Sequence, residues 1–131
     1  MPCLEISMPR QSDEIKQLLA GKLTEAFKLS SSYPIEALGI RFYEYNIGES
    51  VNGGIIWDGH TGKPYIHFVL HIPKQTNDEK TNLISNLTET FTQCLNKPDW
   101  QPVIYINEYP DENIGYDGLS IAQHKKTRAS S

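Results

Sequence analysis

The segment KLTEAFKLSSSYPIEALGIRFYEY, residues 22–45, matches NLTETFTQCLNKPDWQPVIYINEY, residues 86–109, when the chain is shifted along itself by 64 positions. The match needs no gap, and it continues in the same register on both sides. The same shift pairs further identical residues, namely Pro9 with Pro73, Lys16 with Lys80 and Gly54 with Gly118. The sequence therefore predicts a duplicated unit, and 131 residues are enough for one compact domain.

We divide the chain into a single domain over residues 1–118 and a polar tail over 119–131. Within the domain, the two pseudo-repeats cover about residues 2–54 and 66–118. The tail ends in QHKKTRASS, a polar composition that does not require an ordered structure.

Each repeat has the pattern of a strand, a helix and a second strand. Residues 2–8 alternate between apolar and polar side chains, whereas residues 65–72 (YIHFVLHI) are nearly all apolar, which suits a strand covered on both faces. Ser12 and Asn77 are the expected helix caps, because each is followed by two acidic residues that favour the positive end of a helix.

The second strands are predicted over residues 38–45 and 103–109. Because a strand–helix–strand crossover joins parallel strands, two such units give an α+β fold, a four-stranded mixed sheet with both helices on one face. We expect the other face to carry apolar Ile66, Phe68 and Leu70, and we expect oligomerisation to bury them. A glycine-rich segment after the first repeat predicts a hairpin-like arm toward a neighbouring subunit.

Composition and charge disfavour several classes of protein. The formal charge of −4 and the pI near 5.5 argue against nucleic acid as a partner. Cys3 and Cys94 lie outside any metal-binding or disulfide spacing, so the cytoplasm is the expected location. The chain starts without a signal-peptide pattern, and no apolar run approaches the roughly 18 residues of a membrane span, so neither secretion nor membrane insertion is expected.

Two segments and one proline carry a resemblance to a known superfamily. VIYINEYPDENIGYDG, residues 103–118, is similar to the C-terminal strand of the macrophage migration inhibitory factor family and of the cis-3-chloroacrylic acid dehalogenase family. IRFYEYNIGESVNGG, residues 40–54, resembles the corresponding strand and hairpin of the 4-oxalocrotonate tautomerase family. With Pro2 directly after methionine, the chain resembles the tautomerase superfamily. The resemblance implies a homotrimer with active sites at the subunit junctions and no cofactor.

The resemblance makes Pro2 the candidate general acid and base. Removal of Met1 would leave a secondary amine at the start of the chain, and an apolar environment disfavours its protonated form. A neutral amine can take a proton from the carbon beside a carbonyl and return it elsewhere, which is acid–base catalysis of keto–enol exchange. The alternative is that proline merely suits the start of a strand, where its missing N–H costs little.

The resemblance also assigns residues that would surround the substrate. Tyr105 and Asn107 correspond to positions that flank the substrate in the inhibitory factor family, and the Tyr105 hydroxyl would donate toward a developing enolate. The alternative for Tyr105 is an ordinary cross-strand aromatic. Arg41 corresponds to a substrate-binding arginine of the 4-oxalocrotonate tautomerase family and would hold a carboxylate. Its alternative is a structural ion pair with Glu44 or Glu108.

The other expected substrate-binding residues are Ile72, Lys74, Tyr33 and Arg10. Ile72 corresponds to an apolar pocket wall and fits the core equally well, whereas Tyr33 takes the place of a pocket lysine. Lys74 and Arg10 are cations that could hold a carboxylate. Tyr116 replaces the water-activating glutamate of the dehalogenase family, so hydrolytic dehalogenation is not expected.

His67 and His71 point the same way from a predicted strand, but no third ligand lies near them in the sequence, so no metal is expected. The resulting hypothesis is a cofactor-independent tautomerase that acts on a small 2-oxo acid or enol bearing a carboxylate. The alternative is a catalytically idle trimer that binds ligands or proteins, with Pro2 blocked or unused.

Overall fold

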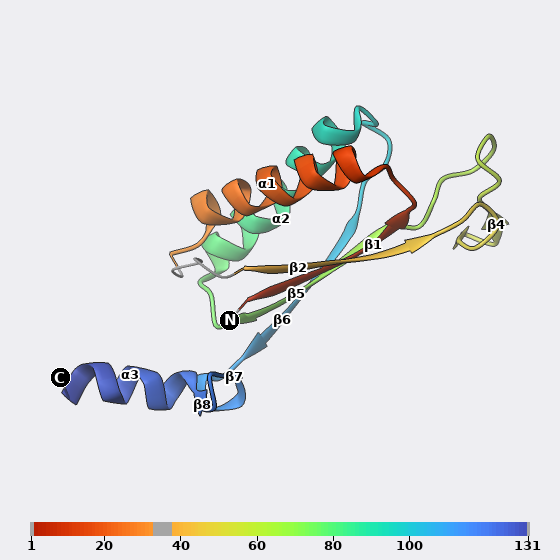
Figure 1. Ribbon diagram of the computed structural model, residues 1–131. Coiled ribbons are helices and arrows are strands. Elements are labelled where there is room, and N and C mark those ends of the chain that lie inside the picture. Colours follow the sequence, from red (N-terminus) through yellow and green to blue (C-terminus); the bar gives the residue numbers. More distant parts are fainter. Residues whose placement is uncertain (1, 33–37, 131) are drawn as a thin grey trace.

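The computed structural model describes residues 2–32 and 38–130, which form a four-stranded sheet with two long helices on one face (Figure 1). The sheet and its helices comprise β1 (Cys3–Pro9), α1 (Asp13–Ser30), β2 (Gly39–Tyr45), β5 (His67–Pro73), α2 (Asn77–Leu95) and β6 (Val103–Tyr109). The smaller elements are β3 (Val51–Asn52), β4 (Ile55–Ile56), η1 (Asp111–Asn113), β7 (Gly115–Tyr116), β8 (Leu119–Ser120) and α3 (Ile121–Ser130).

The strand order of the sheet is β2-β1-β5-β6. The strands within each repeat are parallel, and the two central strands, β1 and β5, are antiparallel to each other. The predicted α+β fold with a four-stranded mixed sheet is therefore confirmed. Because β1 and β5 run in opposite directions, equivalent positions of the two repeats lie at opposite ends of the sheet.

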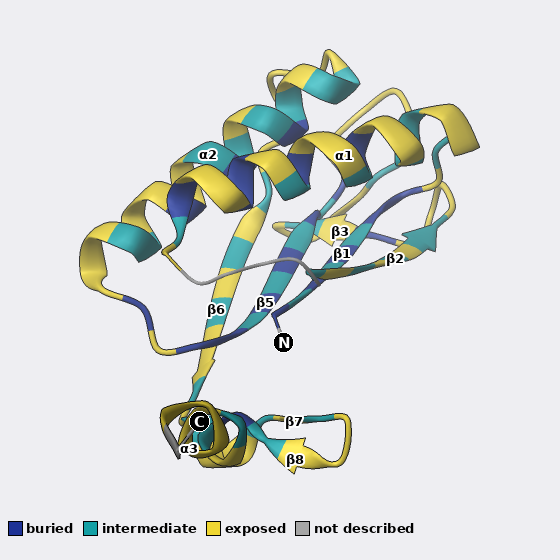
Figure 2. Cartoon of the chain, turned by 60° about the vertical axis from the view of Figure 1, so that its left-hand side comes forward, coloured by how far each residue is buried: buried dark blue, intermediate teal, exposed yellow. Residues whose placement is uncertain are grey.

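The core fills the space between the sheet and the inner faces of α1 and α2 (Figure 2). Alternate side chains of the two central strands are fully buried there, because burying apolar surface is favourable. The rings of Phe68 on β5 and Phe91 on α2 meet edge to face, with their centroids 5.0 Å apart. The core residues of the central strands are Leu4, Ile6, Met8, Ile66, Phe68, Leu70 and Ile72.

The expectation that Ile66, Phe68 and Leu70 form an open apolar face is wrong. All three are at most 2% exposed in the single chain, since they share the face that the helices cover. Successive strand residues point to opposite faces, so the open face carries the alternate set, which includes half-buried His67 and His71. This face is polar and aromatic, and among the described residues no element covers it (Figure 1).

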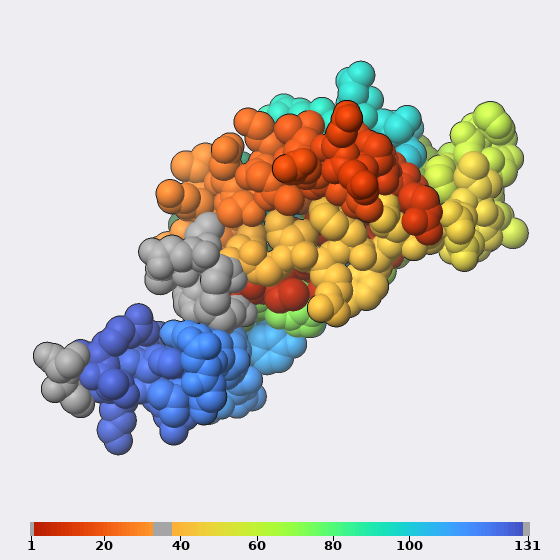
Figure 3. All heavy atoms as spheres, viewed as in Figure 1, coloured from red at the N-terminus to blue at the C-terminus, as the bar shows by residue number. Residues whose placement is uncertain are grey.

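Two small projections extend from opposite ends of the molecule (Figure 3). One contains the β3–β4 hairpin, whose turn residues Gly53 and Gly54 have φ angles of 55° and 82°, as a tight hairpin turn requires. The other contains β7, β8 and α3, of which β8 and α3 form an ordered part of the polar tail over 119–131. Ser120 and Gln123 exchange two hydrogen bonds at the start of α3, and Ile121 is only 2% exposed. These contacts explain the ordered helix.

The helix starts are capped as the sequence predicts in one repeat and one residue earlier in the other. Ser12 Oγ accepts the Ile15 N–H at 3.2 Å, which confirms the first cap. The second cap is Thr76 rather than Asn77. Thr76 Oγ1 accepts the Glu79 N–H, and Glu79 accepts the Thr76 N–H, so the pair forms a capping box.

Glu79 links this cap to the end of α1, and its charge makes the link sensitive to pH. Hydrogen bonds from the N–H of Thr76, then from the N–H and hydroxyl of Ser32, lower the Glu79 pKa from 4.5 to about 2. A carboxyl whose pKa is lowered by folding stabilises the fold above its unfolded pKa and loses that contribution as the pH falls.

We therefore expect Glu79→Gln to lower Tm above pH 4.5, and the difference from the unmodified chain to shrink as the pH falls toward 2. Thermal unfolding followed by circular dichroism across this range is the measurement. Glu89→Gln, on the middle of the same helix, is the control and should show a smaller pH-dependent difference. A Tm difference for Glu79→Gln that stays constant with pH would contradict the assignment.

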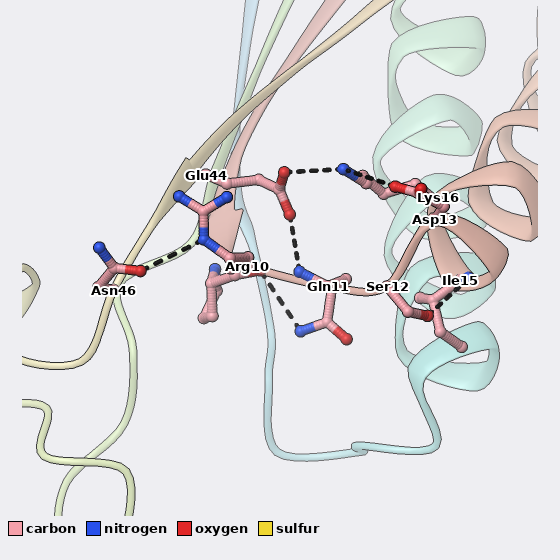
Figure 4. Close-up of polar contacts among 9 residues, drawn as sticks. Arg10, Gln11, Ser12, Asp13, Ile15, Lys16, Glu44 and Asn46 are labelled. Atoms are coloured by element: carbon pink, nitrogen blue, oxygen red, sulfur yellow. Dashed lines mark hydrogen bonds and ion pairs between the residues drawn. The ribbon is translucent and has the colours of Figure 1, made fainter.

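Each repeat contains the same ion pair. Lys16 Nζ donates to Glu44 Oε1 at 3.0 Å, and the backbone N–H of Gln11 donates to Glu44 Oε2 at 2.7 Å (Figure 4). The second repeat reproduces both contacts at the same distances with Lys80, Glu108 and Gln75. Each carboxylate thus ties the loop before a helix to the end of the repeat's second strand.

None of the helices in the described part of the chain is long and apolar enough to span a membrane.

Candidate active site

Pro2 lies buried at the start of β1. Its carbonyl accepts the Gly39 N–H at 3.0 Å, so the residue is fixed to the first residue of β2. The equivalent residue of the second repeat, Ile66, accepts the Val103 N–H at 2.9 Å in the same way. The nitrogen of Pro2 is therefore held at the end of the sheet where β2 begins and β5 ends.

Lys74 is the cation that the fold brings to this end. Cys3 is opposite His71 in the antiparallel pair, so the end of β5 and the exposed Lys74 after it lie beside the start of β1. The Lys74 carbonyl accepts the side-chain amide of Gln75 at 3.1 Å. The structure therefore places Pro2 and Lys74 at one end of the sheet.

The loop that carries Lys74 is fixed by a buried amide and a carboxylate. Gln75 is 6% exposed, and its backbone N–H donates to Glu108 Oε2 at 2.7 Å. This hydrogen bond, followed by that from Lys80, holds the pKa of Glu108 below its usual value. Among the described residues no ion pair involves Lys74, so its ammonium group is available to a ligand.

Tyr105 is distant from Pro2 within the chain. It is paired with Val69, which lies opposite Glu5 and so three residues along the sheet from Pro2, about 10 Å. It also lies two strands away from β1, which adds about 10 Å across the sheet. Its hydroxyl is 3.4 Å from that of Tyr65, and its ring is half exposed. Asn107 is closer in register, since it is paired with His71 on the same open face.

Arg41 has neither of the acidic partners that the sequence suggested. Glu44 and Glu108 pair with Lys16 and Lys80, and among the described residues neither forms an ion pair with Arg41, so the structural alternative finds no support in these two residues. Arg41 is exposed on β2 opposite Glu5, and a hydrogen bond with Tyr43 raises its pKa. It lies on the strand beside β1, two register positions from the Gly39–Cys3 pair, and its charge acts on the Cys3 thiol next to Pro2.

Three candidate residues remain. Ile72 is fully buried in the core, which agrees with its structural alternative rather than with an open pocket wall. Arg10 follows the end of β1, at the opposite end of the strand from Pro2. Tyr33 lies outside the described residues. The fold therefore separates Arg10 and Lys74, although the repeat makes them equivalent.

A chain of hydrogen bonds crosses the open face beside this site, and sequence analysis missed it. Tyr43 Oη donates to Glu5 Oε2 at 3.0 Å, and Glu5 Oε1 is 2.6 Å from His71 Nε2. His71 Nδ1 is in turn 2.8 Å from Tyr109 Oη. Bonding to His71, and then to Tyr43, lowers the pKa of Glu5. The only sequence signal for this chain of hydrogen bonds was the alternation of odd-numbered polar residues along β1 and β5.

Among the described residues no group of three or more His, Cys, Asp or Glu side chains is arranged to hold a metal ion. What the site offers chemically is the buried Pro2, an exposed lysine at the same end of the sheet and polar side chains on the adjoining open face.

Comparisons with known proteins agree with the fold. Residues 64–124 match the model of the Tautomerase family, described as tautomerase enzyme. Among solved structures, native fused 4-OT is 24% identical, with a TM-score of 0.83, and the alignment covers 92% of this chain and 97% of that one. Pt0534 inactivated by 2-oxo-3-pentynoate is 23% identical, with a TM-score of 0.80 and coverage of 93% and 98%.

A third solved structure, the asymmetric trimer of wild-type R7 fused 4-OT, is 25% identical to this chain. Its TM-score is 0.78, and the alignment covers 94% of this chain and 98% of that one. No curated protein matches the sequence.

Proposed function

Because this chain belongs to the tautomerase superfamily, we propose that it is a cofactor-independent keto–enol tautomerase acting on a small 2-oxo acid or the corresponding enol. The observation that carries the proposal is the buried Pro2 at the end of the sheet that also holds Lys74. The similarity to Pt0534, a protein inactivated by a 2-oxo acid, supports this substrate class.

Pro2 would act as the base after removal of Met1. An α-amino group ordinarily has a pKa of about 7.7–8.0, and burial disfavours its charged form, so a useful fraction is neutral near pH 7. The neutral nitrogen takes a proton from the carbon beside the substrate carbonyl, and an enol forms when the carbonyl oxygen gains a proton. The reverse transfer gives the ketone, so no cofactor is consumed.

The remaining residues would have two separate roles, binding of the substrate and stabilisation of the enolate. Lys74 would hold the substrate carboxylate, and Asn107 would border it on the open face. Tyr105 is too far from Pro2 to act in the same chain, so a neighbouring subunit would supply it, and Arg41, on the strand beside β1, would hold a carboxylate. This assignment requires the homotrimer, and the trimeric state of R7 fused 4-OT supports it.

The residue at position 116 argues against hydrolytic dehalogenation. Tyr116 stands at the position expected for a water-activating carboxylate, and it stacks on His124 with 4.0 Å between the ring centroids. It offers no base to a water molecule. The free thiols Cys3 and Cys94 suit a reducing compartment, so we propose the cytoplasm as the location.

The test is the enol–keto exchange of a phenylpyruvate-type substrate, measured with protein whose trimmed start is verified by intact mass. Lys74→Ala should raise KM about tenfold to a hundredfold with little change in kcat, because losing a charged hydrogen bond weakens ground and transition states alike. Lys28→Ala, an exposed lysine in the last turn of α1, is the matched control and should leave KM unchanged.

An unchanged KM in Lys74→Ala would remove Lys74 from the substrate site. Absence of any exchange activity in correctly trimmed protein would instead favour the idle, ligand-binding alternative.

A further inference from the structure

A cleft lies at the end of the sheet opposite Pro2. It has a volume of about 400 Å³ and is lined by Pro9, Arg10, Tyr45, Asn46, Ile47 and Trp57. We propose that this cleft binds a small aromatic carboxylate, with the carboxylate on Arg10 and the ring against Trp57, and that it does so without turnover. The proposal concerns a site separate from that of Pro2 and stands independently of the proposed reaction.

Arg10 is anchored in a way that leaves most of its guanidinium group available. Its backbone N–H donates to the Tyr45 carbonyl at 3.0 Å, and its Nε donates to Asn46 Oδ1 at 3.3 Å (Figure 4). Asn46 is itself held by its N–H, which donates to Glu49 Oε1 at 2.6 Å. The two terminal nitrogens remain for a carboxylate, which an arginine binds through two parallel hydrogen bonds.

Glu44, on whose pKa the charge of Arg10 acts, does not neutralise Arg10. Its two oxygens are occupied by Lys16 and by the backbone of Gln11, and among the described residues no ion pair involves Arg10. Burial alone would raise the pKa of Glu44, but these two hydrogen bonds hold it below its usual value, whereas Arg10 contributes least. Lys16 therefore offsets the charge of Glu44, and Arg10 remains an uncompensated cation at the cleft.

The opposite wall is aromatic and fixed. The Tyr45 and Trp57 rings meet edge to face at 6.2 Å, and Trp57 meets Trp100 in the same way at 6.0 Å. The Trp57 N–H donates to the Ser50 carbonyl at 2.9 Å, so the residue is tied to the base of the hairpin. Ile47 adds an apolar side chain that is 61% exposed. A flat apolar ring suits this wall, and a carboxylate on that ring suits Arg10.

The cleft contains no counterpart of the Pro2 amine. The repeat places Ile66 at the equivalent position, and its nitrogen is an ordinary backbone amide, which cannot act as a base. The two ends of the sheet thus differ in chemistry. One end has a candidate base with a lysine, and the other has a cleft with an arginine, an aromatic wall and no general base among its described lining residues. Binding without proton transfer follows from this difference.

The probe is phenylacetate, titrated into the full-length protein while tryptophan fluorescence is recorded, because Trp57 lines the cleft. We expect a saturable change, with a Kd confirmed by calorimetry. Arg10→Gln should raise Kd about tenfold to a hundredfold, since it removes a charged hydrogen-bonding pair. The Kd of Arg10→Lys should lie between those of the unmodified chain and Arg10→Gln, because lysine keeps the charge but lacks the planar guanidinium group.

Matched variants separate this cleft from the Pro2 site. Lys63→Gln removes an exposed cation after the same hairpin, and Pro2→Ala alters only the other end of the sheet, so both should leave Kd unchanged. Circular dichroism confirms that each variant is folded. The proposal is overturned by an absence of saturable binding at millimolar phenylacetate, by equal Kd values for Arg10→Gln and the unmodified chain, or by loss of binding in Pro2→Ala.

Discussion

Pro2→Ala is expected to lower kcat/KM for enol–keto exchange of a phenylpyruvate-type substrate by about 10²- to 10⁴-fold, the usual contribution of one positioned general base. Alanine keeps an amine after methionine removal but lacks the ring that fixes the direction of the nitrogen. The contact that anchors this residue, from Gly39 N–H to its carbonyl, does not depend on the side chain. Folding should therefore be preserved, and the loss should appear in kcat.

A second form of the protein tests the amine itself. Adding one glycine before Pro2 converts its nitrogen to an amide while the ring stays in place, and we expect the same loss of rate. Pro98→Ala, in the turn after α2, is the matched control and should retain full activity. Normal rates in both Pro2→Ala and the extended chain would exclude Pro2 from the mechanism. Light scattering on each form checks that the oligomeric state is unaltered.

The strands were predictable because burial imposes a period on the sequence. The predicted strand 103–109 coincides with β6, and the predicted strand 38–45 begins one residue before β2. The buried face of β5 was not predicted correctly, because residues 65–72 are almost uniformly apolar and alternation alone selects no face. The repeat held the missing information, since it aligns Phe68 and Leu70 with Leu4 and Ile6, which alternate clearly with polar neighbours.

The cap at Thr76 could also have been predicted from the sequence. Thr76 and Glu79 have the spacing of a capping box, in which a threonine is followed three residues later by glutamate. Asn77 is a good capping residue, but it offers no such reciprocal pair. The choice between adjacent capping residues therefore depends on the partner three positions ahead rather than on the residue type.

The candidate site was less predictable, because it depends on strand direction and on register. Lys74 and Arg10 are equivalent in the repeat, yet the antiparallel pairing of β1 and β5 sends them to opposite ends of the sheet. The bond between Glu5 and His71 joins residues 66 positions apart, and only the cross-strand register brings them together. A role for Tyr105 beside Pro2 requires a second copy of the chain, which no pattern within one sequence specifies.

Phe68→Ala is expected to lower the free energy of unfolding by about 3–5 kcal/mol, the usual cost of truncating a buried phenylalanine. Phe68 is fully buried against Phe91 beneath the helices, so the change leaves a cavity that its neighbours cannot readily fill. Val69→Ala is the matched control, because Val69 points to the open face and is only half buried. Val69→Ala should lower the free energy of unfolding by much less.

Urea unfolding at two protein concentrations distinguishes this core position from the subunit-contact position that the sequence had suggested for Phe68. A core residue stabilises each chain by itself, so the loss in Phe68→Ala should be the same at both concentrations. A residue on a subunit contact would instead make the loss depend on concentration, because association shifts apparent stability by mass action. A concentration-dependent loss of stability, together with dissociation of the oligomer in light scattering, would instead show that Phe68 is a subunit-contact residue.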